Sequence, residues 1–373
     1  MQRWRFLSLA MNGSRLRAWA RLLGINLLVV LVGVIMIELA LGRWFAPYHP
    51  PSGSIFRRTF KLQQQLYQPY GVVTYVRDEY GLRGSEKAVD KIEVASVGGS
   101  TTDQIFISEG ETWQDVVHAL TGIRITNAGD EGISSTGHLV AVVEWLHRIP
   151  DFHPRFYLHY IGLNDAAFAY AWTLPESKAL VEAQIADQEN RRALHRFIRG
   201  RSALVQGAIA LQSWLTGPPK IFTAPPASPP GPGRPEFRAA VNEQPIMDYI
   251  RRIYEPNLRR LIAEHQNRNE EAIFVSQTMR PSLFRIEGNS VWGRDPAIAG
   301  YAMALRLVNA ATEAVCRSAP TCHFIDLASE ISFQDDEFYD NVHTTPAGAR
   351  RIGAYLAEKL PSIVRAPSVS RAK

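Results

Sequence analysis

The sequence predicts an α/β protein in which helices cover a parallel sheet, preceded by one transmembrane helix. Short apolar runs that end in glycine-containing turns, near residues 94–99 and 124–132, predict the strands. An amphipathic segment follows each run, and such alternation is typical of right-handed βαβ units. A long apolar stretch near the N-terminus predicts the membrane helix.

The composition is that of a folded protein with one large or two modest domains. The chain has 373 residues, 46% of them hydrophobic, and a net charge of +5. Much of that charge comes from arginines near the N-terminus, so the composition does not favour a nucleic-acid partner. No repeat of solenoid period is present.

Residues 22–42 form the predicted membrane anchor, because they are almost wholly apolar and lie between Arg21 and Arg43. Five arginines precede them (Arg3, Arg5, Arg15, Arg17 and Arg21), so the positive-inside rule makes residues 1–21 a cytoplasmic tail. A cleaved signal peptide is the alternative, but the apolar run is long and no clear cleavage site follows. We expect a single-pass inner (cytoplasmic) membrane protein, its remainder periplasmic or extracellular.

The exported part divides into three predicted regions. Residues 43–90 form a juxtamembrane segment rich in proline, glutamine and tyrosine, in which no catalytic chemistry is visible. Residues 91–362 form the main domain, and residues 363–373 form a tail.

Ser100 occupies the most informative turn of the main domain. Residues 94–97 predict a buried strand, after which Gly98 and Gly99 permit a tight turn. Ser100 follows at the carboxyl end of the strand, where open α/β sheets place their ligands. The simpler interpretation is a serine that only caps a helix.

Two further strand–turn–helix units follow. Residues 124–135 repeat the first design and lead into a helix predicted over 135–146. A third strand is predicted over 156–161 and ends at the sequence Gly-Leu-Asn-Asp of residues 162–165. Strands at this spacing predict a parallel sheet.

Residues 170–245 form a predicted insertion. Residues 174–215 have helical periodicity, with an apolar stripe beside several arginines, and residues 217–235 are so rich in proline that we expect an extended loop. The helices could form a lid or a membrane-facing surface. We favour a solvated basic face.

The C-terminal third returns to regular alternation. Helices are predicted over 247–266 and 299–315, with strands over 272–277 and 323–327. In the last helix Thr345 is the predicted N-cap, Pro346 the first residue and Pro361 the end. The spacing of Cys316 and Cys322 fits neither a zinc site nor a redox motif, and whether they pair depends on the compartment.

Asp340 and His343 lie in the loop before that last helix and match the needs of acyl transfer. A serine nucleophile requires a base for its proton and a carboxylate that orients the base. The oxyanion also requires fixed donors, for which the candidates are Ser100 N–H, Gly132 N–H and the Asn164 side-chain amide. Each signal alone is compatible with an ordinary surface turn.

Four sequence blocks together resemble the SGNH hydrolase superfamily, the GDSL esterases and lipases. The blocks are residues 98–102 (Gly-Gly-Ser-Thr-Thr), 127–132 (Asn-Ala-Gly-Asp-Glu-Gly), 162–165 and 340–343 (Asp-Asn-Val-His). The resemblance covers about residues 78–362 and is greatest to bacterial, membrane-anchored members with a Gly-Leu-Arg segment, here at residues 81–83. Gly99 departs from the pattern, because it stands where the family's eponymous motif has aspartate.

The resemblance implies the fold, the site residues and the activity. The implied fold is three-layered and flavodoxin-like. The implied nucleophile is Ser100, with His343 and Asp340 as its partners, and the implied oxyanion donors are Ser100, Gly132 and Asn164, with Gly129 as the fallback glycine. No metal or organic cofactor is implied, and His147, His153 and His159 do not fit a helical metal motif.

The implied function is that of a cell-envelope serine ester hydrolase that removes acetyl or other short acyl groups from a glycan. A lipase or lysophospholipase with the insertion as its lid is one alternative, and a polysaccharide O-acyltransferase is another. A catalytically silent glycan-binding or assembly scaffold is the non-enzymatic alternative. The expected partners are an acylated glycan or lipid and the membrane, and the oligomeric state stays open.

Overall fold

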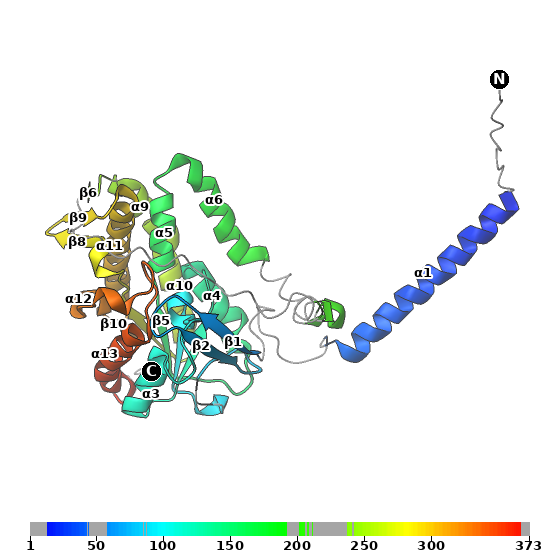
Figure 1. The fold of residues 1–373 in the computed structure, drawn as a ribbon, viewed down its shortest axis with the longest axis horizontal. Helices are drawn as coiled ribbons and strands as arrows, with labels where there is room; N and C mark the ends of the chain where they lie inside the picture. The colour runs from blue at the N-terminus through cyan, green and yellow to red at the C-terminus, as the bar shows by residue number, and fades with distance from the viewer. Residues whose placement is uncertain are drawn as a thin grey trace, which may run out of the picture.

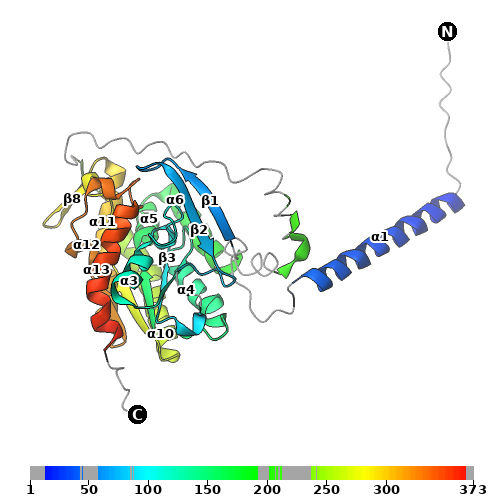
Figure 2. The ribbon, with the colours of Figure 1, turned by 60° about the horizontal axis from the view of Figure 1, so that its bottom comes forward.

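The computed structural model describes most of the chain. It covers residues 13–42, 44, 58–84, 86, 88–191, 201–205, 207–208, 211, 237–240 and 242–366. Helix α1 (Gly13–Leu41) projects away from the α/β domain, as Figures 1 and 2 show. Its segment Arg17–Leu41 has a mean hydropathy of 2.6 and is not buried in the protein. One apolar N-terminal helix of this length fits a single membrane anchor or a signal sequence.

The core of the domain is a five-stranded sheet in which all paired neighbours are parallel. Its spatial order is β10 (Cys322–Ile325), β7 (Glu271–Val275), β5 (Phe156–Tyr160), β3 (Val94–Gly98), β4 (Ile125–Gly129). Numbered along the chain, this is the 2-1-3-4-5 order of flavodoxin-like, doubly wound folds. The predicted fold class is confirmed.

Helices cover both faces of the sheet. Successive strand residues point to opposite sides, and the strands β3, β5 and β7 are buried at every position, so both faces need a covering layer. On one face, Val94 and Ile273 pack against α3 (Trp113–Thr121) and α13 (Pro346–Val364). On the other face, Val97 and Phe274 pack with a larger set of helices. That set comprises α4 (Ser135–Glu144), α5 (Leu163–Ala171), α9 (Glu243–Tyr249), α10 (Glu255–Asn267) and α11 (Pro296–Arg317). The three predicted layers are therefore present.

Smaller elements surround these layers. Strands β1 (Arg58–Gln64) and β2 (Gly71–Arg77) form an antiparallel hairpin, and β6 (Phe237–Arg238), β9 (Ser290–Gly293) and β8 (Phe284–Glu287) form a second small sheet. The remaining elements include the four-residue helices α2 (Ser100–Asp103) and α12 (Leu327–Glu330) and the longer α6 (Pro175–Ala186). The predicted juxtamembrane segment thus contains a hairpin, and the domain boundary at residue 91 stays a prediction.

Several predicted helix boundaries differ from those observed. The predicted helix at 174–215 is observed as α6 and a π-helical turn over Asp187–Arg191, and its central part lies outside the described residues, as does the proline-rich stretch 217–235. The helix predicted at 247–266 begins at Glu243 and passes through a π-helical turn, Ile250–Tyr254.

The end of α13 was predicted wrongly. Thr345 does cap it, accepting a hydrogen bond from Gly348 N. The helix, however, continues past Pro361 to Val364, because a proline in the last turn removes only one backbone donor. At the end of α11, Cys316 is joined to Cys322 by a disulfide, which answers the question that the sequence left open.

Candidate active site

Three strand ends converge at the point where the strand order reverses. Ser100 opens α2 after β3, Gly132 lies in the turn after β4, and Asn164 lies in the first turn of α5 after β5. The carboxyl ends of parallel strands lie at one edge, and ligands of doubly wound folds bind at this switch point. The order of the sheet therefore brings together residues that the sequence places far apart.

Gly99 explains how closely these elements approach. A Cβ at this position would lie 2.7 Å from Asn164 Nδ2 and 3.6 Å from the carbonyl oxygen of Ile133. A side chain here would push the asparagine away from the start of α2. The departure from the family pattern at this position therefore has a steric reason in this chain.

His343 joins Ser100 to Asp340 across its two ring nitrogens. Its Nε2 lies 2.7 Å from Ser100 Oγ, and its Nδ1 lies 2.6 Å from Asp340 Oδ2. The side chain of His343 is 26% exposed, which leaves its ring accessible to solvent and to a ligand. The loop before α13 thus returns to the sheet edge beside Ser100.

Asp340 is held in its charged form by its surroundings. Burial alone would raise the pKa of this carboxyl, but hydrogen bonds from the His343 ring and from two backbone N–H groups lower the pKa overall. Oδ1 accepts from Val342 N at 2.8 Å and from His343 N at 2.7 Å. The carboxylate therefore fixes the backbone of the loop with one oxygen and the imidazole with the other.

Tyr339 supports the imidazole from one face. Its ring stacks on His343 with a centroid separation of 5.6 Å and an interplanar angle of 9°. Tyr339 N also donates to His343 O at 3.0 Å, and Tyr67 of the loop between β1 and β2 contacts the tyrosine ring. The sequence analysis missed this residue, although an aromatic side chain directly before Asp340 was a usable signal.

Asn164 is oriented so that one hydrogen of its side-chain amide donates to the protein backbone and the other stays available to a ligand. Its Nδ2 donates to the carbonyl of Ile133 at 2.8 Å, which ties it to the turn containing Gly132. Gly132 has φ +72°, a left-handed conformation that favours glycine. Ser100 is the first residue of α2, so its N–H has no partner within the helix.

Gly129, the fallback donor, is committed elsewhere. Its N–H donates to Asn127 Oδ1 at 2.9 Å, and its carbonyl accepts from Arg77 Nη2 at 2.6 Å. A Cβ here would collide with the backbone of Asp103 in α2. The observed contacts therefore favour Gly132 over Gly129.

A buried acid lies directly behind Asn164. Asp165 Oδ2 accepts from Ser135 N and Oδ1 accepts from Ser135 Oγ, both at 2.7 Å, while Tyr249 donates to Oδ1 at 3.0 Å. Burial raises the pKa of Asp165 to about 6, against the lowering effect of these bonds. These contacts join the start of α4 to the start of α5.

Two buried arginines, Arg77 and Arg83, bind the end of α2. Sequence reasoning did not find them. Arg77 of β2 pairs with Asp103 at 2.7 Å, and Arg83 pairs with Glu109 at 2.7 Å. Both arginine side chains are at most 2% exposed. The hairpin and the Gly-Leu-Arg segment are thus part of the scaffold that positions Ser100.

Among the described residues, one group of side chains could hold a metal ion, and it lies away from Ser100. Ligand atoms of His147, His265 and Glu270 lie within 4.8 Å of one another. Both histidines contact Glu270 Oε2 at 3.0 Å, so hydrogen bonds alone also account for the cluster. His159 is fully buried and lies 3.0 Å from His265, whereas His153 is exposed. The predicted lack of a metal stays a prediction.

Known proteins resemble this chain only distantly. No protein-family model and no curated protein sequence matches it. Among solved structures it is similar to a GDSL-like lipase from Bacteroides thetaiotaomicron, at 13% identity and a TM-score of 0.36 over 73% of this chain and 89% of that one. It is also similar to a catalytic mutant of Axe2, an acetylxylan esterase from Geobacillus stearothermophilus. The identity is 14% and the TM-score 0.39 over 75% of this chain and 96% of that one. A third similar structure is a member of the lipolytic G-D-S-L family from Veillonella parvula, at 15% identity and a TM-score of 0.36 over 72% of this chain and 97% of that one.

Its structural neighbours are thus GDSL-type esterases and lipases at low identity. Likenesses this distant carry no conclusion about activity.

Proposed function

We propose that the protein is a serine ester hydrolase in which Ser100 is the nucleophile, His343 the base and Asp340 the group that orients the base. The observation that carries this proposal is the single imidazole within hydrogen-bond distance of both Ser100 Oγ and Asp340 Oδ2. This arrangement satisfies the geometric requirement for activating a hydroxyl, because the nucleophile contacts the base and the base contacts a carboxylate.

In the proposed first step, Ser100 Oγ attacks the ester carbonyl carbon while His343 Nε2 accepts the hydroxyl proton. Asp340 stabilises the imidazolium that forms. The carbonyl π electrons move to oxygen, and the oxyanion accepts hydrogen bonds from Ser100 N–H, Gly132 N–H and the second amide hydrogen of Asn164. When the tetrahedral intermediate collapses, the C–O bond breaks and His343 returns the proton to the departing alcohol.

Water completes the cycle. It attacks the acyl-serine carbonyl, and His343 takes a proton from it. The second intermediate releases the carboxylic acid as His343 returns the proton to Ser100 Oγ. A sugar hydroxyl in place of water would make the same site an acyltransferase.

We further infer that the substrate is an acetylated or otherwise short-acylated glycan of the cell envelope. The apolar residues 22–42 of α1, with the arginines that precede them, support an uncleaved anchor and an exported domain. The disulfide between Cys316 and Cys322 is in keeping with an oxidising compartment. Deacylation of a glycan is the ester chemistry that this location favours.

The proposal is tested with the full chain in detergent micelles and nitrophenyl esters from acetate to laurate. We expect turnover to be greatest on acetate and to fall by at least about 10³-fold in Ser100→Ala. Ser362→Ala, an exposed serine in α13, is the matched control and should behave as wild type. A preference for laurate would favour a lipase. Turnover that does not depend on Ser100 would contradict the proposal.

A further inference from the structure

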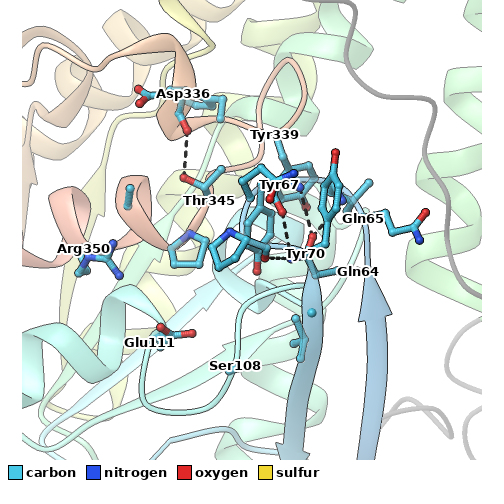
Figure 3. Close-up of a pocket in the computed structure, with 18 of the residues that line it drawn as sticks. Gln64, Gln65, Tyr67, Tyr70, Ser108, Glu111, Asp336, Tyr339, Thr345 and Arg350 are labelled. Carbon is cyan, nitrogen blue, oxygen red and sulfur yellow. Dashed lines mark hydrogen bonds between the residues drawn. The ribbon is translucent and has the colours of Figure 1, made fainter.

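A cavity of about 720 Å³ lies beside the loop that carries Asp340 and His343 (Figure 3). Segments that are far apart in the sequence enclose it: the loop between β1 and β2, residues 336–339 and the start of α13, together with Ser108, Glu111 and Arg280. Tyr339 lines this cavity and also stacks on His343. The cavity therefore shares a wall with the imidazole that contacts Ser100.

The lining combines aromatic rings with polar groups of both signs. Tyr67, Tyr70 and Tyr339 supply rings, and Glu111, Asp336 and Arg350 supply charges (Figure 3). Arg280 also lines the cavity, so two basic groups balance two acidic ones. Such a lining suits neither an acyl chain, which needs an apolar wall, nor a polyanion, which needs an excess of positive charge. Sugar rings present C–H faces to aromatic rings and hydroxyl edges to donors and acceptors, so they match this mixture.

The wall formed by the β1–β2 loop is rigid because one buried side chain holds it. Gln64 is 2% exposed, and its Nε2 donates to the carbonyls of Tyr67 and Pro69 at 3.1 and 2.9 Å. Its Oε1 accepts from the backbone N–H groups of Leu66 and Tyr67. A preformed wall reduces the ordering cost of binding a ligand.

Tyr67 and Tyr70 have different roles in this wall. The Tyr67 hydroxyl donates to the carbonyl of Phe106, and its ring centroid lies 6.0 Å from that of Tyr339. Tyr70 is 56% exposed, so its ring is available to a ligand. Exposed aromatic surface at the mouth of a polar cavity costs solvation unless a partner covers it.

We propose that this cavity is a subsite for an oligosaccharide segment, and that Tyr70 provides its stacking platform. The inference rests on the proposed esterase function, since the bound segment would carry its acyl group past Tyr339 to Ser100. The volume lies within the range of roughly 300–1,000 Å³ that is usual for ligand pockets, and it exceeds what an acetyl group requires. Selectivity for acylated glycan over small esters would then come from this site and not from the triad.

The test compares two substrates in the detergent-solubilised full chain. Nitrophenyl acetate reports the triad alone, and chemically acetylated xylotetraose reports the triad together with the cavity. We expect Tyr70→Ala to raise KM for the acetylated tetrasaccharide about tenfold, with kcat and all constants for nitrophenyl acetate unchanged. Phe237→Ala, an aromatic side chain 48% exposed outside the cavity, should change neither substrate.

Three results would overturn the subsite. They are an unchanged KM for the tetrasaccharide in Tyr70→Ala, an equal loss on both substrates, and a selective loss on nitrophenyl laurate, which would indicate an acyl-chain site.

Failure of the esterase proposal is recognised separately, because wild type would then not hydrolyse nitrophenyl acetate. In that event, calorimetric titration of Ser100→Ala with acetylated xylotetraose decides the matter. Heat of binding that is lost on adding Tyr70→Ala supports the subsite, and no binding at millimolar ligand rejects it.

Discussion

Two histidine–carboxylate pairs lie at opposite ends of the parallel sheet, and their environments differ. His343 and Asp340 lie beside the carboxyl ends of the strands, 2.6 Å apart. His265 and Glu270 lie just before β7, at the amino end, 3.0 Å apart. The second nitrogen of His343 meets a serine hydroxyl, whereas that of His265 meets His159.

The two pairs also differ in how deeply their histidines are buried. Burial lowers the pKa of His265 and His159, and it lowers the pKa of His138, the next imidazole in the chain of contacts, to about 3. These rings are neutral at physiological pH and serve as hydrogen-bonding core side chains. An imidazole beside a carboxylate is therefore not a catalytic unit until an accessible nucleophile stands at its other nitrogen.

The sharpest test of this difference is removal of each pair in turn. His343→Ala should reduce turnover of nitrophenyl acetate by about 10³–10⁴-fold, because Ser100 loses its base, and the midpoint of urea unfolding should hardly change. His153→Ala is the matched control, since His153 is exposed and lies outside both pairs. Residual activity within tenfold of wild type would remove His343 from the proposed triad.

Glu270→Ala should have the opposite profile. Two imidazole N–H groups would lose their acceptor inside the protein, so we expect the free energy of unfolding to fall by about 2–4 kcal/mol. Turnover per folded molecule should stay within twofold of wild type. Urea unfolding followed by tryptophan fluorescence measures the first quantity. If Glu270→Ala lowered turnover and left the stability unchanged, the conclusion that only the His343–Asp340 pair serves catalysis would be wrong.

Stability should also fall with acid because of the buried histidines. In the unfolded chain His138, His159 and His265 bind protons as the pH falls through about 6.5, whereas the folded protein keeps them neutral. Each such proton lowers the free energy of unfolding by about 1.4 kcal/mol per pH unit below that value. Asp165 acts oppositely, because its folded pKa of about 6 lies above the ordinary 3.8.

Burial also raises the pKa of Glu131, so three histidines oppose two carboxyls, and we predict a net loss of stability between pH 6.5 and 5. Urea midpoints at half-unit pH steps check this, and His138→Gln should flatten the slope. A stability that is constant over this interval would show that the buried histidines are charged in the folded protein.

The smallest expected effect concerns the spacing between Ser100 and Asn164. Gly99→Ala places a Cβ 2.7 Å from Asn164 Nδ2, so the amide must shift. We expect kcat to fall about 10- to 100-fold, in line with the displacement of one oxyanion donor, with a small change in KM. Gly207→Ala, where a Cβ meets no atom within 4 Å, is the control. An unchanged kcat would exclude Asn164 as a donor.

The two regions also differ in how far the sequence predicts them. Ser100, Asn164, Asp340 and His343 lie at positions whose local signals survive in the linear sequence, and the strand–helix alternation predicts a parallel sheet. The order of its strands was implied only by the family resemblance. Their roles stay predictions, although their positions now agree with those roles. The contacts of Arg77 with Asp103 and of His159 with His265 have no local signal, because each joins residues that only the fold brings together.

Element ends were less predictable, for a related reason. The helix predicted at 247–266 starts earlier, where Asn242 caps it, and contains a π-helical turn. Pro361 did not end α13, because contacts of that helix with α3 outweigh one missing backbone donor. Tertiary packing decides such details, and periodicity alone does not contain it.

The separation of 243 residues between Ser100 and His343 has a consequence for biogenesis. Synthesis proceeds from the N-terminus, so the strand that presents Ser100 emerges well before His343 and α13. Until α13 docks against α3, Ser100 has no base. If Ser100 is the proposed nucleophile, a nascent chain would therefore be inert toward esters until α13 has docked.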